Sequence, residues 1–110
     1  MDFTELRRHP RVIVDFFADW GWGSECEHYD KITSISLGGC FLATKRELSS
    51  GQEIYLRLTG QTSGMINLRG TVRYQIRLME GAPPAGAGIE FIGVSGESER
   101  KLQTVVDDYG

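Results

Sequence analysis

Residues 66–78 read INLRGTVRYQIRL, with apolar or small side chains at the even positions and polar ones at the odd positions. A repeat of two residues is the period of a β-strand, whose neighbouring side chains point to opposite faces. The stretch is longer than most strands, and Gly70 lies on its apolar face. A long strand with a glycine on that face often bends to serve both sides of a small barrel, so we expect a bend at Gly70.

Shorter stretches with strand character surround this one. They cover residues 12–18, 32–35, 40–44, 54–58 and 88–92, with clusters of glycine, serine and proline between several of them. After Gly93 the spacing changes, because the apolar residues are spaced for one helical face: Leu102, Val105, Val106 and Tyr109. Ser95 is placed to cap that helix. Strands in series followed by one helix predict an all-β barrel or curled sheet with the helix packed on its rim.

Composition limits the classes of function. The chain of 110 residues is the size of one domain. With 12 basic and 15 acidic residues its net charge is −3, which disfavours nucleic acid and anionic membranes as partners. No apolar run is long enough to cross a membrane and no secretion signal is visible, so we expect a cytoplasmic protein without membrane insertion. Its two cysteines are expected to be reduced thiols.

Catalytic and metal sites find little support in the sequence. Cys26 and His28 are spaced to share one face of a strand, which would make a thiol and imidazole pair or half a metal site. No second pair completes such a site, and no pair of carboxylates is set apart for acid–base chemistry. We therefore expect no enzyme, no metal and no cofactor. An enzyme would need a pocket in which Cys26 and His28 converge.

A basic cluster precedes the first strand. Arg7, Arg8 and Arg11 fall within five residues, and Pro10 disfavours helix at the residue before it. An extended segment with guanidinium groups can wrap an anion, since each group meets a phosphate in a two-pronged geometry. The alternative is that these are solvated charges of a terminal tail.

A second candidate segment is Ser34-Ile35-Ser36-Leu37-Gly38-Gly39, at the end of a predicted strand. Paired glycines let the backbone turn sharply and expose its N–H groups. Short hydroxyls there can bond a ligand, or they can bond only the turn itself.

Together the two segments resemble the PilZ family of cyclic di-GMP receptors, which carries Arg-x-x-x-Arg followed by x-x-Ser-x-x-Gly. Here the first motif covers residues 7–11 and the second residues 34–39. The resemblance extends over nearly the whole chain. Further matches in order and spacing are Gly51 before residues 54–56, the tripeptide at 70–72, Gly88 to Phe91, and the closing helix.

The resemblance implies a six-stranded antiparallel barrel with one C-terminal α-helix, as a single domain over residues 1–110. Residues 1–11 would be a flexible switch segment, 12–93 the barrel and 96–109 the helix. The ligand would be cyclic di-GMP, with Arg7 and Arg11 gripping phosphate and guanine and Arg8 an extra phosphate contact. Ser36 would bond the ligand, and Gly39 would leave room for it. Binding would order the switch segment and signal to an output protein, which could belong to motility or surface machinery.

One position departs from the family pattern. Ser34 stands where the family usually has Asp or Asn, and a hydroxyl reaches less far than a carboxylate that can accept two guanine N–H bonds. We therefore expect cyclic di-GMP to bind with reduced affinity. The alternative is a degenerate PilZ-like adaptor that binds no nucleotide and acts through protein contacts.

Four further arginines are expected on the outer face of the long strand and its neighbour. They are Arg57, Arg69, Arg73 and Arg77. They could extend an anion-binding surface, or they could be the solvated face of two strands.

Overall fold

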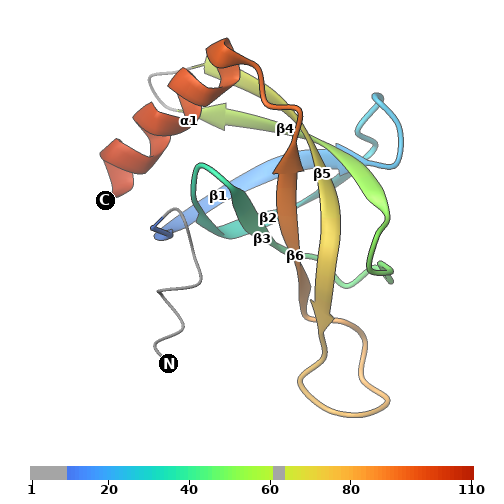
Figure 1. Ribbon diagram of the computed structural model, residues 1–110. Helices are drawn as coiled ribbons and strands as arrows, with labels where there is room; N and C mark the ends of the chain where they lie inside the picture. Colours follow the sequence, from blue (N-terminus) through green and yellow to red (C-terminus); the bar gives the residue numbers. More distant parts are fainter. Residues whose placement is uncertain (1–9, 61–63) are drawn as a thin grey trace.

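The computed structural model describes residues 10–60 and 64–110 of the chain. Its strands are β1 (Val12–Gly21), β2 (His28–Ile35), β3 (Gly39–Ala43), β4 (Glu53–Gly60), β5 (Gly64–Ile76) and β6 (Gly86–Ile92), followed by the helix α1 (Gly96–Tyr109). The strands close into a barrel in the order β1-β2-β3-β6-β5-β4, and every neighbouring pair is antiparallel. The predicted six-stranded antiparallel barrel with one C-terminal helix is therefore confirmed (Figure 1).

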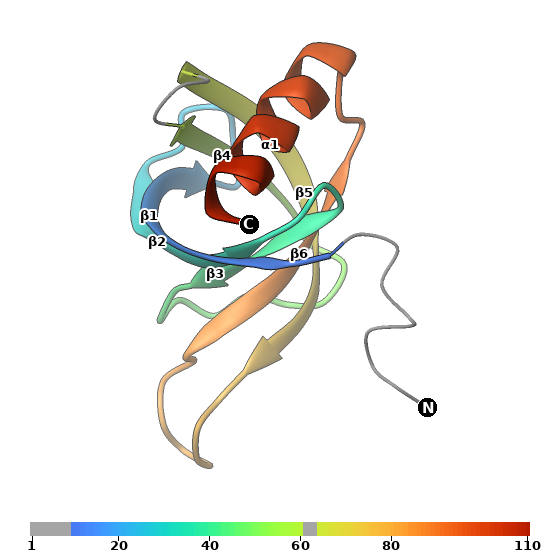
Figure 2. The ribbon, with the colours of Figure 1, turned by 90° about the vertical axis from the view of Figure 1, so that its left-hand side faces the viewer.

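The barrel interior is the hydrophobic core. Its largest fully buried apolar side chains are Trp20, Ile32, Ile35, Leu42, Ile54, Leu56, Leu58, Ile66, Val72, Ile89 and Leu102. They come from all six strands and from the helix, whose Leu102 and Val105 are buried. The helix packs against β1 and β5 at one end of the barrel, while the loop that joins β5 to β6 projects from the other end (Figures 1 and 2).

The long strand β5 pairs with both of its neighbours. It meets β4 along residues 64–71 and β6 along residues 69–76. Gly70 lies in the shared stretch, facing the core, where an added Cβ would collide with the side chain of Ile89. The irregularity in the pairing comes slightly later, between Val72 and Tyr74 rather than at Gly70.

The prediction that the alternating residues of this strand share one apolar face is wrong after that irregularity. Tyr74 and Ile76 are exposed, and Leu78 lies beyond the end of β5 with 84% of its surface exposed. The side chains keep alternating in sequence, but β5 leaves β4 after Thr71 and extends past the core after Val72. Periodicity alone cannot show where a strand leaves the barrel.

The first two strands are longer than predicted. β1 continues to Gly21 because Trp20 is buried in the core, and its indole N–H donates to the Asp30 carboxylate on β2 at 2.8 Å.

Cys26 and His28 do not lie on one strand. β2 begins at His28, so Cys26 precedes it in the loop between β1 and β2, with a left-handed φ of 49°. The expectation that Cys26 and His28 share a strand face is therefore wrong.

The remaining elements agree with the sequence. α1 begins after Ser95, whose hydroxyl accepts a hydrogen bond from the main-chain N–H of Ser98 at 3.1 Å, as expected for an N-cap. Within residues 10–60 and 64–110, no three His, Cys, Asp or Glu side chains are grouped to hold a metal ion. In the same part of the chain, no helix has the length and apolar character needed to cross a bilayer.

Candidate functional site

The turn between β2 and β3 is held by the Ser36 side chain. Its hydroxyl oxygen accepts hydrogen bonds from the main-chain N–H groups of Gly38 at 3.1 Å and Gly39 at 3.2 Å. The Ser36 N–H donates to the Gly39 carbonyl at 2.8 Å, and the Phe91 N–H on β6 donates to the Gly38 carbonyl at 2.9 Å. Ser36 is 4% exposed. Hydroxyl and backbone therefore satisfy one another, as in other serine-built turns.

Gly39 is required by the close approach of β3 and β6. In this register Gly39 lies opposite Glu90 and Cys40 opposite Ile89. A Cβ on Gly39 would collide with the Ile89 carbonyl oxygen, and backbone of a neighbouring strand cannot move aside as a flexible side chain can. The glycine at this position thus has a packing reason inside the domain.

Arg11 is brought to the same corner of the barrel from the other side. Val12 pairs with Ile35 and Ile13 with Ser34, so the residue before β1 lies next to the end of β2. One terminal N–H of the Arg11 guanidinium donates to the Ser34 hydroxyl at 3.4 Å. The predicted site residues Arg11, Ser34, Ser36 and Gly39 are therefore gathered at one end of β2. Arg7 and Arg8 lie outside the described residues.

The charge of Arg11 has no carboxylate partner in this region. None of the ion pairs found in residues 10–60 and 64–110 involves it. Its positive charge also acts on the buried thiol of Cys40. Burial raises the pKa of this thiol from 9.0 to about 12, and Arg11 acts to lower it. A half-buried cation without a counter-ion can accept an anionic ligand.

Two apolar residues border Ser34 and were not predicted as part of a site. Ile13 on β1 and Phe41 on β3 lie directly opposite Ser34 in the strand pairing, and Ile13 is 80% exposed. A cation, a hydroxyl and apolar side chains on one surface suit a ligand that has both charge and a flat ring. The signal in the sequence was an isoleucine on the face of the first strand that points away from the core.

Comparison with known proteins identifies the family. A family model described as "PilZ domain" matches residues 5–108. The chain belongs to the PilZ domain family. The matched range includes all six predicted site residues, among them Arg7 and Arg8. No curated protein sequence matches significantly.

Several solved structures share the fold. The PilZ domain of YcgR from Escherichia coli, with c-di-GMP, is 16% identical with a TM-score of 0.68, covering 94% of this chain and 91% of that one. The MrkH–c-di-GMP complex from K. pneumonia is 24% identical (TM-score 0.71; 93% and 51% covered). The inhibitor of motility MotI/DgrA of Bacillus subtilis is 17% identical (TM-score 0.74; 94% and 50% covered). The present PilZ chain thus spans about half the length of MrkH and MotI.

Proposed function

We propose that this PilZ domain is a receptor for cyclic di-GMP. The observation that supports this most directly is the corner formed by Arg11, Ser34 and the Ser36–Gly39 turn. There a guanidinium that makes no ion pair within the described residues lies beside the half-buried Ser34 hydroxyl and the exposed Ile13. The structures of YcgR and MrkH to which the chain is similar both contain c-di-GMP. The domain would act by binding and not by catalysis.

The proposed roles follow from what each group can offer. Arg7 and Arg11 would grip phosphate and guanine, with Arg8 as a further phosphate contact, because guanidinium groups meet phosphate with paired N–H donors. Gly39 would leave room for the ligand beside Ser36, whose contact with the ligand is part of this proposal. The ligand would shift the population of arrangements of the segment before β1, and an output protein would read that change. The domain would do this in the cytoplasm.

Ser34 sets the expected strength of binding. Its side chain is too short to accept two guanine N–H bonds as a carboxylate could. By analogy with base-edge contacts in DNA, the loss of a two-pronged contact costs roughly 1–3 kcal/mol, or about tenfold to a hundredfold in affinity. We therefore place the affinity of this chain in the micromolar range.

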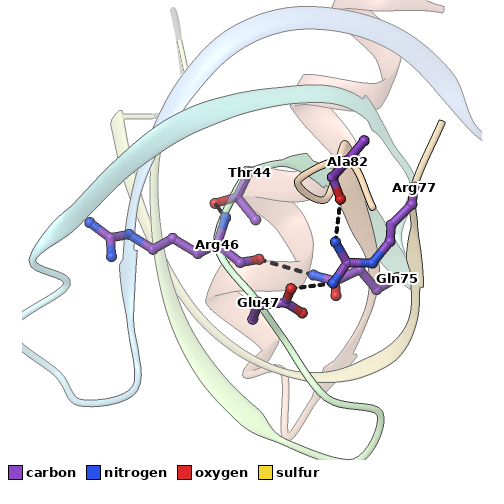
Figure 3. Close-up of polar contacts among 6 residues, drawn as sticks. All are labelled: Thr44, Arg46, Glu47, Gln75, Arg77 and Ala82. Carbon is purple, nitrogen blue, oxygen red and sulfur yellow. Dashed lines mark hydrogen bonds and ion pairs between the residues drawn. The ribbon is translucent and has the colours of Figure 1, made fainter. Parts of the chain in front are cut away.

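Titration calorimetry with cyclic di-GMP tests the proposal. We expect heat of binding for the wild type, tighter binding for Ser34→Asp, and a loss of about tenfold or more for Arg11→Ala, since charge-assisted hydrogen bonds disappear. Arg46→Ala is the control, because the hydrogen bonds of Arg46 in the described chain are made by its main chain (Figure 3). No heat with either the wild type or Ser34→Asp would contradict the proposal.

A PilZ adaptor that acts without nucleotide is the second candidate. Two observations favour it: the substitution at Ser34, and the exposed apolar residues at the far end of the β5–β6 hairpin, Tyr74, Ile76, Leu78 and Met79. One structurally similar protein is an inhibitor of motility. The same calorimetry separates the two candidates, since an adaptor of this kind would give no heat even after Ser34→Asp.

A further inference from the structure

The four arginines Arg57 on β4, Arg69 and Arg73 on β5, and Arg77 directly after β5 fall into two pairs with different surroundings. Arg73 lies 3.4 Å from the Glu90 carboxylate, and the Arg77 guanidinium contacts both the Glu47 carboxylate and the Ala82 carbonyl (Figure 3). Arg57 and Arg69 take part in none of the ion pairs of the described residues. Two of the four positive charges are therefore neutralised locally and two are not.

Arg57 and Arg69 line a cavity of about 400 Å³ on the outer side of β4 and β5. One wall is the loop between β1 and β2, with Ser24 and Cys26, and another is the connection from β6 into α1 at residues 92–98. In the barrel order, β4 and β5 lie opposite β2 and β3, so this cavity is separate from the corner at Ser34 and Gly39. We call it the β4–β5 pocket.

The two guanidinium groups are held on the same surface. In the pairing of β4 with β5, Tyr55 lies opposite Arg69 and Arg57 opposite Asn67, so the arginines are diagonal neighbours. Arg57 Nε donates to Asn67 Oδ1 at 3.4 Å, and Arg57 Nη2 donates to the Ser24 carbonyl at 3.3 Å. These bonds orient one cation across the pocket before any ligand arrives.

Arg69 lies over Gly93 on the other side. A Cβ built on Gly93 would come 3.7 Å from Arg69 Nη2, and the φ of 58° at this residue favours glycine. The second guanidinium therefore lies within van der Waals reach of the connection that leads into α1, and the backbone conformation there is one that glycine adopts readily.

The acidic groups near the pocket form no ion pair with Arg57 or Arg69 within the described residues. Asp19 lies opposite Arg57 in the pairing of β1 with β4, and Glu25 is in the β1–β2 loop, but neither is within ion-pair distance of Arg57. Burial raises the pKa of the pocket thiol Cys26, Arg57 acts to lower it, and Asp19 and Glu25 act to raise it. Positive and negative charges thus both act on this wall, and apart from the Arg57 donors that bond Asn67 and Ser24, the guanidinium N–H groups make no hydrogen bond within the described residues.

We infer that the β4–β5 pocket binds a small molecule that carries a phosphate or carboxylate group beside a compact apolar body. The two guanidinium groups supply paired donors for the oxyanion. Tyr55, Ile92 and Val94 supply apolar wall, and the volume is in the range of small-molecule sites. This site is independent of the proposed cyclic di-GMP site.

Amide chemical shifts of the isotope-labelled protein test this inference with simple probes. Inorganic phosphate, phenyl phosphate, benzoate and neutral benzyl alcohol would be added separately. We expect phenyl phosphate or benzoate to shift the amides of Ser24, Asn67 and Gly93 in a saturable way, more strongly than inorganic phosphate and much more strongly than benzyl alcohol. The stronger of the two aromatic anions identifies the preferred oxyanion. Equal shifts with benzyl alcohol, or none with either aromatic anion, would overturn the inference.

Variants assign the binding to the two arginines. Arg57→Gln combined with Arg69→Gln should weaken the aromatic anion by about tenfold or more. Arg73→Gln, a change on β5 outside the pocket, should leave the binding of the aromatic anion unchanged. The double variant should still bind cyclic di-GMP as the wild type does, which separates this site from the one at Arg11. Unchanged binding of the aromatic anion by the double variant would contradict the assignment.

Discussion

The Ser36–Gly39 turn and the Arg11–Ser34 contact lie side by side, yet they are built differently. In the turn, the Ser36 hydroxyl is buried and bonded to two main-chain N–H groups, and Gly39 packs against the neighbouring strand. In the contact, a half-buried guanidinium makes one long hydrogen bond of 3.4 Å to a half-buried hydroxyl. Polar groups that are satisfied and buried stabilise the fold, whereas groups that keep bonding capacity at the surface are suited to a ligand.

The difference divides these residues of the two sequence motifs into two kinds. Ser36 and Gly39 mainly hold the shape of the corner, although Ser36 is also proposed to contact the ligand, and Arg11 and Ser34 mainly face what binds there. Changes in the turn should therefore be measured mainly as a loss of folding stability. Changes at Arg11 and Ser34 should be measured mainly as altered binding.

The largest effect is expected for Gly39→Ala. The added Cβ would collide with the Ile89 carbonyl, so strands β3 and β6 would have to separate, and we expect the free energy of unfolding to fall by about 2–3 kcal/mol. Urea denaturation measures this change in the free energy of unfolding. Gly96→Ala is the control, because its Cβ would meet only the end of the Arg100 side chain and alanine favours a helix. Equal stability of Gly39→Ala and the wild type would show that the turn is not tightly packed.

Ser36→Ala should cost about 1–2 kcal/mol of folding stability, since it removes the acceptor of two main-chain N–H groups, one of them on the buried Gly39. The same denaturation experiment applies. A loss of cyclic di-GMP binding without any loss of stability would assign Ser36 to the ligand alone, and the division drawn above would fail.

Stability at alkaline pH should depend on Cys40, the residue that follows the turn. Its pKa is raised by burial from 9.0 to about 12, so in the window between these values the unfolded chain loses the thiol proton while the folded chain keeps it. Folding stability is thus fully present below pH 9 and falls as pH rises through the window, by about 1 kcal/mol per pH unit from this group. Denaturation at a series of pH values should show a shallower fall for Cys40→Val, and parallel curves for the two proteins would refute this.

The smallest effect is expected for Ser34→Ala. Its hydroxyl accepts one long hydrogen bond from a partly exposed guanidinium, so folding stability should change by less than about 0.5 kcal/mol. Thermal denaturation of this variant beside Ser36→Ala sharpens the contrast between the two serines. A loss as large as that of Ser36→Ala would mean that the Arg11–Ser34 bond belongs to the fold.

Local pattern was sufficient for most of the elements. Alternation in residues 66–72, the spacing of Leu102 and Val105, and the cap at Ser95 each depend on near neighbours in the chain, and each prediction was confirmed. The pattern failed where the burial of the side chains changes along the strand while their alternation continues. Tyr74 and Ile76 continue the alternation, but they lie where β5 has left β4.

The candidate site was predicted only in part for the same reason. Residue type and spacing pointed to Arg11, Ser34, Ser36 and Gly39, because guanidinium groups, hydroxyls and glycines have recognisable chemistry. The flanking Ile13 and Phe41 are ordinary strand residues, and only the pairing of β1, β2 and β3 places them beside Ser34.

By itself, the order of residues determined that this chain is a small β-barrel closed by a helix and that an arginine segment accompanies a serine and glycine turn. The tertiary structure alone decided which hydroxyl is buried in the turn and which remains beside Arg11. It also decided that Arg73 and Arg77 are paired with carboxylates while Arg57 and Arg69 line a pocket. Burial and charge pairing depend on residues distant in sequence, and these meet only when the barrel closes.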